Sequence, residues 1–350
     1  QRGDPPALRL ESLTRMLPSR SAAVEFVVGA EELYVFVLTV TSDRRSQVEV
    51  KRIPWKRQDV AREVRGFRRL LATRSLGYSD VAARLYRRIF DPVASQLSSK
   101  DELILVPDGA LWELPFQALR MPDGTHLIER RAVSYAPSLT YLQERQGKPR
   151  QTTSNQLLAV GNPTGANIPH AEREARELPQ VYSGGASKAL TGAQATKAAW
   201  LEAAPNYRVL HVATHGVLNS SNPMYSWLSF AQTRGADDVL EAREVLGLNL
   251  RADIAILSAC ESARGEVSAG EGMRGMSWAF LAAGVSTTVV SQWAVDSAST
   301  TQLMLEFHRN LQRSGGKASA MRSAALSLMK MPQFRHPFYW AAFVTIGDPQ

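Results

Sequence analysis

Cysteine is almost absent from this chain of 350 residues, which contains only Cys260. A single cysteine forms no disulfide within the chain and supplies no cysteine-rich metal site. Four of the six histidines, His126, His170, His308 and His336, show no spacing typical of metal ligands. We therefore expect neither a metal ion nor another cofactor. A free thiol kept for chemistry fits the cytoplasm best, and we expect that location.

Long apolar runs are missing as well. The sequence has no stretch of about eighteen consecutive apolar residues, which excludes a transmembrane helix. Residues 1–6 lack the apolar segment of a signal peptide. The chain also lacks an initiator methionine, so we expect it to be a piece of a longer protein. We find no repeat of roughly 20–50 residues and no heptad run.

Acidic residues are scarce in one region. Residues 44–88 hold 14 lysines and arginines but only four acids, although the net charge of the whole chain is +8. Such a region could bind nucleic acid or an acidic protein. However, no aromatic residues accompany the charges in the pattern that stacks on bases. We therefore favour the solvated faces of arginine-rich helices and keep nucleic-acid binding as an alternative.

Apolar runs typical of strands alternate with segments that have helical periodicity. Residues 24–29 and 33–40 are rich in β-branched and aromatic residues and predict an antiparallel pair. Two amphipathic helices follow. The continued alternation favours an α/β fold with a mainly parallel sheet and helices on both faces. The first helix is defined by Val60, Val64, Phe67 and Leu71, and the second by Val81, Leu85, Ile89, Val93 and Leu97.

A break in this pattern divides the chain. Residues 146–156 are polar, contain glycine and proline, and lack periodicity, which is typical of a domain boundary. We therefore predict two subdomains, residues 1–150 and residues 151–350. The first has no cysteine and offers only His126 for catalysis, so we expect the chemistry to lie in the second.

Two short apolar runs in the second half each end in a reactive side chain. Residues 209–214 precede His215, and residues 254–259 precede Cys260. Runs of this length predict buried strands of a parallel sheet, whose carboxyl ends share one edge. The sequence thus predicts that His215 and Cys260 end their strands at the same edge. A thiol beside an imidazole is the pairing of a cysteine nucleophile with its base.

Six segments in order carry a resemblance to a known family. The combination resembles the CHAT family of caspase- and separase-like cysteine proteases and covers nearly the whole chain. His215 and Cys260 are 45 residues apart, close to the interval of about 50 in caspases, although only Ala259-Cys260 matches the caspase sequence around the cysteine. The segments are residues 106–116, 211–216, 257–260, 270–273, 291–296 and 336–343.

The resemblance implies a caspase-like catalytic subdomain preceded by a smaller pseudo-protease-like α/β subdomain. It also implies a cysteine endopeptidase that uses a His-Cys dyad to cleave a specific protein partner. Upstream TPR repeats or other sensor domains are expected to gate the activity. The alternative from a different class is a catalytically silent scaffold or interaction module.

The resemblance assigns roles to single residues. In the family the histidine before a glycine is the base, which is His215, and His211 is then structural. Gly216 leaves room for a substrate to approach the backbone. The backbone N–H groups of Gly216 and Cys260 are implied as donors to the oxyanion.

A glycine-rich motif offers a rival interpretation. Gly270, Gly272 and Gly275 form the pattern G-x-G-x-x-G of dinucleotide-binding loops, which should follow a strand directly. Gly270 comes ten residues after Cys260, and Glu271 would place a carboxylate beside the pyrophosphate. We therefore interpret the segment, including Glu271, as the loop and helix start that shape the substrate groove.

Asp296 follows a predicted strand at the edge expected for Cys260. A carboxylate there would pair with a lysine or arginine of the substrate, and separase-like relatives cut after arginine. We therefore hypothesise that Asp296 selects a basic residue. Ser297 stands where the family often has a second Asp, which leaves room for a neutral residue such as Met or Leu. Alternatively, Asp296 caps the helix that starts near Ser299.

Overall fold

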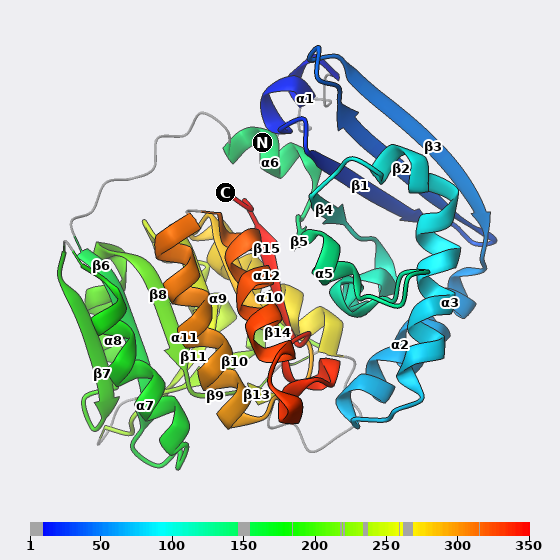
Figure 1. Cartoon of the computed structure of the whole chain (residues 1–350). Helices are drawn as coiled ribbons and strands as arrows, with labels where there is room; N and C mark the ends of the chain where they lie inside the picture. Colours follow the sequence, from blue (N-terminus) through cyan, green and yellow to red (C-terminus); the bar gives the residue numbers. More distant parts are fainter. Residues whose placement is uncertain are drawn as a thin grey trace. The chain divides into compact units, whose positions relative to one another are not determined.

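The structure is a computed structural model in which the chain divides into two compact units (Figure 1). The first comprises residues 1–149 and 347–350, and the second residues 150–346. Most of the predicted boundary at residues 146–156 lies outside the described residues. The structure describes residues 10–145, 155–183, 185–217, 219, 221–233, 237–258, 260–261, 269–314 and 316–350.

The sheet of the first unit has the strand order β3-β2-β1-β4-β5. The first three strands form an antiparallel meander, whereas β4 and β5 run parallel to β1. The predicted antiparallel pair is therefore confirmed, with Val27 opposite Tyr34. The strands are β1 (Ser21–Val28), β2 (Glu32–Val40), β3 (Ser46–Pro54), β4 (Glu102–Val106) and β5 (Ala132–Tyr135).

Amphipathic helices cover this sheet. The predicted face of Val60, Val64, Phe67 and Leu71 is fully buried in α2. The second predicted helix is wrong beyond Phe90: a 3₁₀ turn holds Pro92, which lacks the N–H of a helical ladder, and a short helix follows. The helices are α1 (Leu10–Met16), α2 (Arg57–Ala72), α3 (Tyr78–Phe90), α4 (Ala94–Leu97), α5 (Leu127–Arg130) and α6 (Leu139–Arg145).

The basic stretch lies on β3, α2 and α3, where several of its cations have acidic partners. Arg68 pairs with Glu113 at 3.6 Å, and Arg88 pairs with Glu63 at 3.1 Å. The guanidinium of Arg88 also lies over the ring of Trp55, 4.5 Å from its centroid. These contacts fit arginine-rich helix faces with intramolecular roles.

The sheet of the second unit has the strand order β15-β14-β12-β8-β6-β7. The registered pairs from β14 through β7 are all parallel. Strand β7 was not predicted from the sequence; its burial is partial, and it lies at the end of the strand order. The strands are β6 (Asn155–Pro163), β7 (Ser187–Gly192), β8 (Tyr207–Ala213), β12 (Ile254–Leu257), β14 (Thr287–Ser291) and β15 (Phe343–Gly347).

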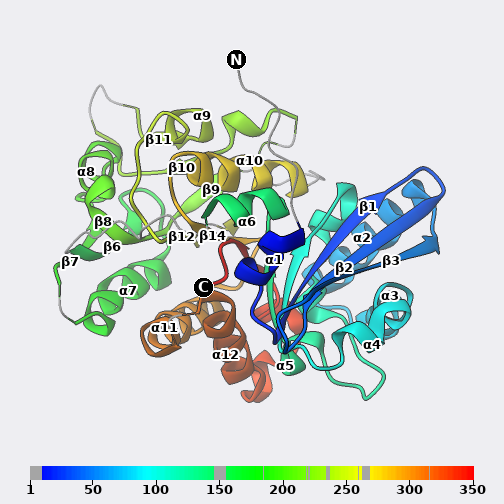
Figure 2. The same ribbon diagram turned by 90° about the horizontal axis from the view of Figure 1, so that it is seen from above.

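Helices lie on both faces of this second sheet (Figure 2). Helices α7, α11 and α12 cover one face, and α8 and α10 cover the other. The predicted α/β fold, with a mainly parallel sheet between helices, is confirmed. No helix in the described ranges is long and apolar enough to cross a membrane. The helices are α7 (Pro169–Glu177), α8 (Lys197–Ala203), α9 (Ala242–Val245), α10 (Ala269–Ala282), α11 (Ser297–Ser314) and α12 (Lys317–Met329).

Candidate functional site

His215 and Cys260 lie on a second, smaller sheet and not at the ends of the main strands. Strand β8 ends at Ala213 and β12 ends at Leu257, so the predicted position of both residues needs correction. The buried Thr214 hydroxyl donates to the Ser229 carbonyl oxygen at 2.8 Å, where the chain passes from β8 to the smaller sheet. That sheet has the order β11-β10-β9-β13, with strands β9 (His215–Val217), β10 (Trp227–Ser229), β11 (Val239–Glu241) and β13 (Cys260–Glu261).

The register of this sheet brings the two reactive residues together. Strands β9 and β13 are parallel, with Cys260 opposite His215 and Glu261 opposite Gly216. Neighbouring strands lie about 5 Å apart, so the backbones of the two residues are adjacent. Gly216 is buried and is also paired with Leu228 of β10. The side chain of Cys260 lies outside the part of the chain that the structure describes.

A backbone carbonyl orients His215. The imidazole Nε2 lies 2.7 Å from the carbonyl oxygen of Ala166. A carbonyl oxygen only accepts hydrogen bonds, so Nε2 must carry the proton and neutral His215 keeps Nδ1 free of a proton. The Ala166 carbonyl thus fills the orienting role that a carboxylate has in a Ser-His-Asp triad.

A tight loop holds Ala166 in place after β6. Asn162 and Asn167 have positive φ angles of 46° and 52°, a region that asparagine tolerates better than most residues. The Asn162 Oδ1 accepts a hydrogen bond from the Ile168 backbone at 2.7 Å. Its Nδ2 donates to Glu172 of α7 at 2.9 Å. These bonds fix the direction of the Ala166 carbonyl.

A pocket of about 200 Å³ opens beside His215. Besides His215 and the neighbouring Thr214, its walls include Ala171 and Glu174 of α7, Ser258 after β12, and the start of α11. The polar lining includes the side chains of Thr300 and Thr301. The pocket therefore joins the candidate base to a concave and mostly uncharged surface.

Asp296 serves as a helix cap. Its Oδ1 accepts a hydrogen bond from the Ser299 backbone at 2.9 Å, at the start of α11. Its neighbours Val295 and Ser297 line the pocket, whereas Asp296 is not among the described lining residues. The geometry supports the capping interpretation of this residue.

The glycine-rich segment lies inside helix α10 and not in a loop before it. Gly275 packs so closely against Pro223 that a Cβ there would overlap the Pro223 ring and carbonyl. Helix packing thus explains this third glycine of the motif without a phosphate. Glu271 belongs to the same helix, but its side chain lies outside the described part of the structure.

Sequence reasoning missed the partners of His211. The fully buried His211 ring places Nε2 2.7 Å from Glu174 Oε1 and Nδ1 3.1 Å from His308 Nε2. His308 Nδ1 in turn lies 2.6 Å from the hydroxyl of Tyr182. The position of His211 inside an apolar strand could have indicated such partners, because a buried imidazole requires hydrogen bonds to polar groups.

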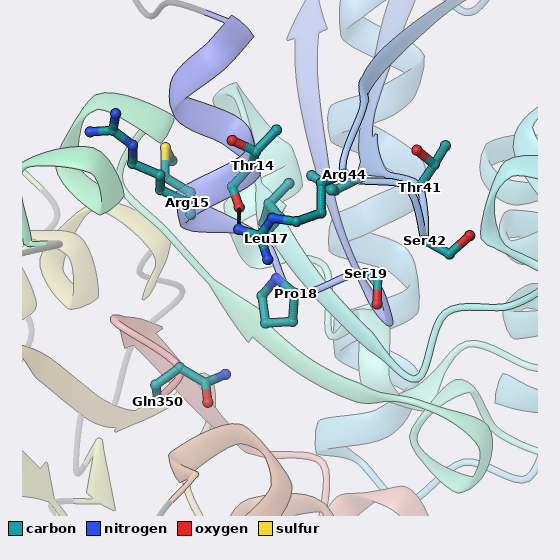
Figure 3. Close-up of a pocket in the computed structure, with 11 residues that line it drawn as sticks. Thr14, Arg15, Leu17, Pro18, Ser19, Thr41, Ser42, Arg44 and Gln350 are labelled. Atoms are coloured by element: carbon teal, nitrogen blue, oxygen red, sulfur yellow. Dashed lines mark hydrogen bonds between the residues drawn. The ribbon is translucent and has the colours of Figure 1, made fainter.

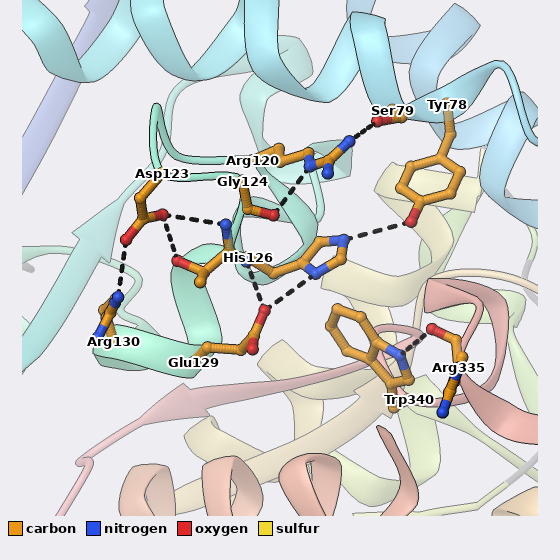
Figure 4. A network of polar contacts seen from close by, with 11 residues as sticks. Tyr78, Ser79, Arg120, Asp123, Gly124, His126, Glu129, Arg130, Arg335 and Trp340 are labelled. Carbon is orange, nitrogen blue, oxygen red and sulfur yellow. Dashed lines mark hydrogen bonds and ion pairs between the residues drawn. The ribbon is translucent and has the colours of Figure 1, made fainter. Parts of the chain in front are cut away.

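The first unit has a polar network of its own around His126 (Figure 4). His126 Nδ1 lies 3.3 Å from Glu129 Oε1, and Nε2 lies 3.3 Å from the Tyr78 hydroxyl. Glu129 also accepts a hydrogen bond from the His126 backbone at 2.7 Å. His126 and Glu129 form the capping box of helix α5, which gives His126 a structural role.

A larger pocket of about 470 Å³ lies in the first unit, beside α1 and the turn after β2 (Figure 3). Arg44 has a positive φ angle of 62° and donates from Nη2 to the Thr14 carbonyl at 2.9 Å. The described lining residues include no cysteine or histidine. This pocket therefore offers none of the chemistry expected at His215. In the described ranges, we find no cluster of three or more His, Cys, Asp or Glu side chains that could hold a metal ion.

Two solved structures show the same type of fold. The separase–securin complex of Saccharomyces cerevisiae matches with a TM-score of 0.65 and 10% identity, over 97% of this chain and 30% of that chain. The Arg-specific cysteine proteinase gingipain R matches with a TM-score of 0.52 and 11% identity, over 83% and 74%. The chain thus has a protease-like α/β fold that resembles the caspase-like domain of separase.

Two curated relatives are much longer proteins. The chain is 29% identical to human tetratricopeptide repeat protein 28 and 28% identical to its Mus musculus counterpart, over 299 residues. The match covers 71% of this chain but only 12% of each relative. The family model of the CHAT domain matches residues 79–348, and the chain therefore belongs to the CHAT domain family.

Proposed function

We propose that the chain is a cysteine endopeptidase in which Cys260 is the nucleophile and His215 the general base. The observation that carries the proposal is the register of the smaller sheet, where Cys260 lies opposite His215. The Ala166 carbonyl supports it by holding the proton on Nε2 of His215. The protease-like fold is consistent with this chemistry.

In the proposed reaction, Nδ1 of His215 takes the proton of the Cys260 thiol. The thiolate attacks the scissile carbonyl carbon, and the backbone N–H groups of Gly216 and Cys260 stabilise the oxyanion. The imidazolium returns its proton to the leaving amine, which leaves a thioester on Cys260. Water then attacks the thioester and gives its proton to His215. His215 returns this proton to the departing Cys260 sulfur, so the acid product leaves and the thiol is restored.

The substrate in this proposal is a specific protein, held in part by the segment around Glu271 and by the edge near Asp296. We keep Asp296 as the proposed selector of a basic substrate residue, in addition to its cap. Asp296 lies between Val295 and Ser297 in sequence, and both of these residues line the pocket beside His215.

The names of the relatives support a regulatory partner. Both are tetratricopeptide repeat proteins and extend far beyond the matched region. We therefore propose that a TPR or other sensor domain gates the protease, in the cytoplasm, where a free thiol stays reduced.

An electrophilic peptide probe tests the proposal on the full-length protein in its activated state. The expected result is covalent modification of Cys260, identified by mass spectrometry of the peptide that contains it. Cys260→Ala should abolish labelling, and His215→Ala should slow it strongly. If the full-length wild-type protein remains unlabelled in its activated state, the chain is a silent scaffold.

A further inference from the structure

Four buried polar side chains form a continuous hydrogen-bonded network in the second unit. Hydrogen bonds link Glu174 to His211, His211 to His308, and His308 to Tyr182, at 2.7, 3.1 and 2.6 Å. The first three are at most 1% exposed and Tyr182 is 6% exposed. They belong to α7, β8, α11 and the residue after a 3₁₀ turn. This series of hydrogen bonds thus links α7, β8 and α11 beside the candidate site.

The network holds its protons in an ordered arrangement. Burial and the neighbouring His211 lower the pKa of His308 well below its usual value, so this ring is neutral and has a single N–H. Burial also raises the pKa of Tyr182, which therefore remains a phenol. Each link needs one proton between its two polar atoms, so the position of one proton determines the next.

Glu174 lies on a helix that follows the hydrogen-bond acceptor of His215, so it can hold that segment in position. Its helix, α7, begins three residues after Ala166, whose carbonyl accepts the hydrogen bond of His215. Its partner His211 lies on β8, the strand that leads through Thr214 to His215. The Glu174–His211 pair therefore connects the two segments that carry the two ends of the His215–Ala166 hydrogen bond.

Other contacts hold α7 against β6 and α11, and the Glu174–His211 pair links it to β8. Helix α7 is seated on β6 by Gly161, where a Cβ would overlap the Ala171 carbonyl. Its first residues are held to α11 by the Thr301 hydroxyl, which donates to the His170 carbonyl at 3.2 Å. An apolar pair could bury the same area, but it would not set the spacing of helix and strand as narrowly as a short hydrogen bond between two buried polar groups.

We propose that Glu174 and His211, supported by His308, are positioning residues for the candidate dyad. They set the geometry of the Ala166–His215 hydrogen bond and thereby the pH at which Cys260 becomes a thiolate. This inference rests on the proposed function, since it assumes that His215 acts on Cys260. Neither Glu174 nor His211 is assigned any contact with the reacting atoms.

The test measures the rate of alkylation of Cys260 by iodoacetamide as a function of pH in the whole protein. Mass spectrometry of the Cys260 peptide keeps the readout specific to this thiol. A thiolate stabilised by His215 should react with a midpoint below the value of about 8.5 for a free cysteine. His215→Ala should move the midpoint up to that value.

Glu174→Gln is expected to raise the midpoint by about one unit, which lowers the rate roughly tenfold at a pH below both midpoints. Glu177→Gln is the matched control, because Glu177 is on the same helix but pairs with the exposed Arg173. It should leave the profile unchanged. Thermal melts of both variants show whether the effect is only a loss of stability, which would lower Tm without moving the midpoint.

His308→Phe provides a second variant if Glu174→Gln does not fold. It keeps a ring against Tyr182 and removes the hydrogen bond to His211, so a smaller shift in the same direction is expected. If His215→Ala moves the midpoint but Glu174→Gln and His308→Phe do not, the positioning role is overturned and the proposed function stands. If His215→Ala has no effect either, both proposals are overturned.

Discussion

The imidazole of His215 donates from Nε2 to the backbone carbonyl of Ala166 over 2.7 Å. This bond uses a main-chain atom where many hydrolases use a carboxylate, so no substitution at position 166 removes the acceptor. The orientation of His215 therefore depends on the backbone of the loop after β6 and on the helix that follows it.

Gly161→Ala is expected to displace this loop by pushing α7 away from β6. The new methyl group would overlap the Ala171 carbonyl and the Ala175 side chain, so α7 must shift away from β6. We expect the free energy of unfolding to fall by about 1–3 kcal/mol, the usual cost of overpacking. Urea denaturation measures the change.

Gly66→Ala is the control for that experiment. A Cβ at Gly66, inside α2, meets no atom within 4 Å. The substitution should stabilise the protein by up to about 1 kcal/mol through helix propensity. An equal loss of stability in both variants would show that steric overlap at Gly161 is not the cause.

The stability of the chain should fall as the pH drops below about 6.5, the ordinary pKa of histidine. His308 has a lowered pKa in the folded state, so between pH 6.5 and its folded pKa only the unfolded chain takes up a proton. This uptake removes up to about 1.4 kcal/mol of unfolding free energy for each pH unit. Urea titrations at pH 7.5 and 5.5 measure it.

His308→Phe should flatten this dependence, since the variant has no imidazole to titrate at that position. The comparison is made between slopes and not between absolute stabilities, because the substitution also removes two hydrogen bonds. A slope equal to that of wild type would contradict the assignment.

Two substitutions separate the cap of Asp296 from its proposed role in selectivity. Asp296→Asn keeps an oxygen that accepts from the Ser299 backbone, whereas Asp296→Ala removes it. We expect Asp296→Ala to lose about 1 kcal/mol of stability and Asp296→Asn to lose little. With activated enzyme and a positional peptide library, both should lose a preference for Arg or Lys. Retention of that preference in Asp296→Asn would leave Asp296 as a cap alone.

The basic stretch is expected to bind nucleic acid only weakly. Arg68 and Arg88 already have acidic partners within the first unit. Fluorescence anisotropy with labelled duplex DNA should give low affinity at physiological salt. Tight binding that weakens steeply as salt rises would instead support the nucleic-acid interpretation.

Local patterns predicted most of the framework. The face of Val60, Val64, Phe67 and Leu71 was visible because a helix repeats its contacts every three or four residues. The cap at Asp296 was visible because it spans only three residues. Proline is a helix-breaking residue, so Pro92 indicated an end to the second helix. The apolar residues of that helix, however, kept their spacing through Leu97, and the prediction followed the spacing.

The rest depends on contacts between distant residues. Strands of two or three residues, such as β9 and β13, are too short to show any period, so the smaller sheet could not be predicted. Glu174 and His308 are 37 and 97 residues from His211, and no spacing rule connects them. The sequence indicated that His211 was structural. The physical reason, its hydrogen bonds to Glu174 and His308, appears only when α7, β8 and α11 pack together.

The pairing of β13 with β9 gives an estimate of the free energy that regulation requires. Among the described residues, two paired positions join the strand of the candidate nucleophile to β9. Backbone hydrogen bonds contribute about 1 kcal/mol each, so forming or releasing this pairing involves only a few kcal/mol. About 5.5 kcal/mol of differential affinity moves a two-state equilibrium from 1% to 99%. If the sensor domain proposed above gates the site, the binding energy of a few good contacts is enough to switch the pairing of β9 with β13.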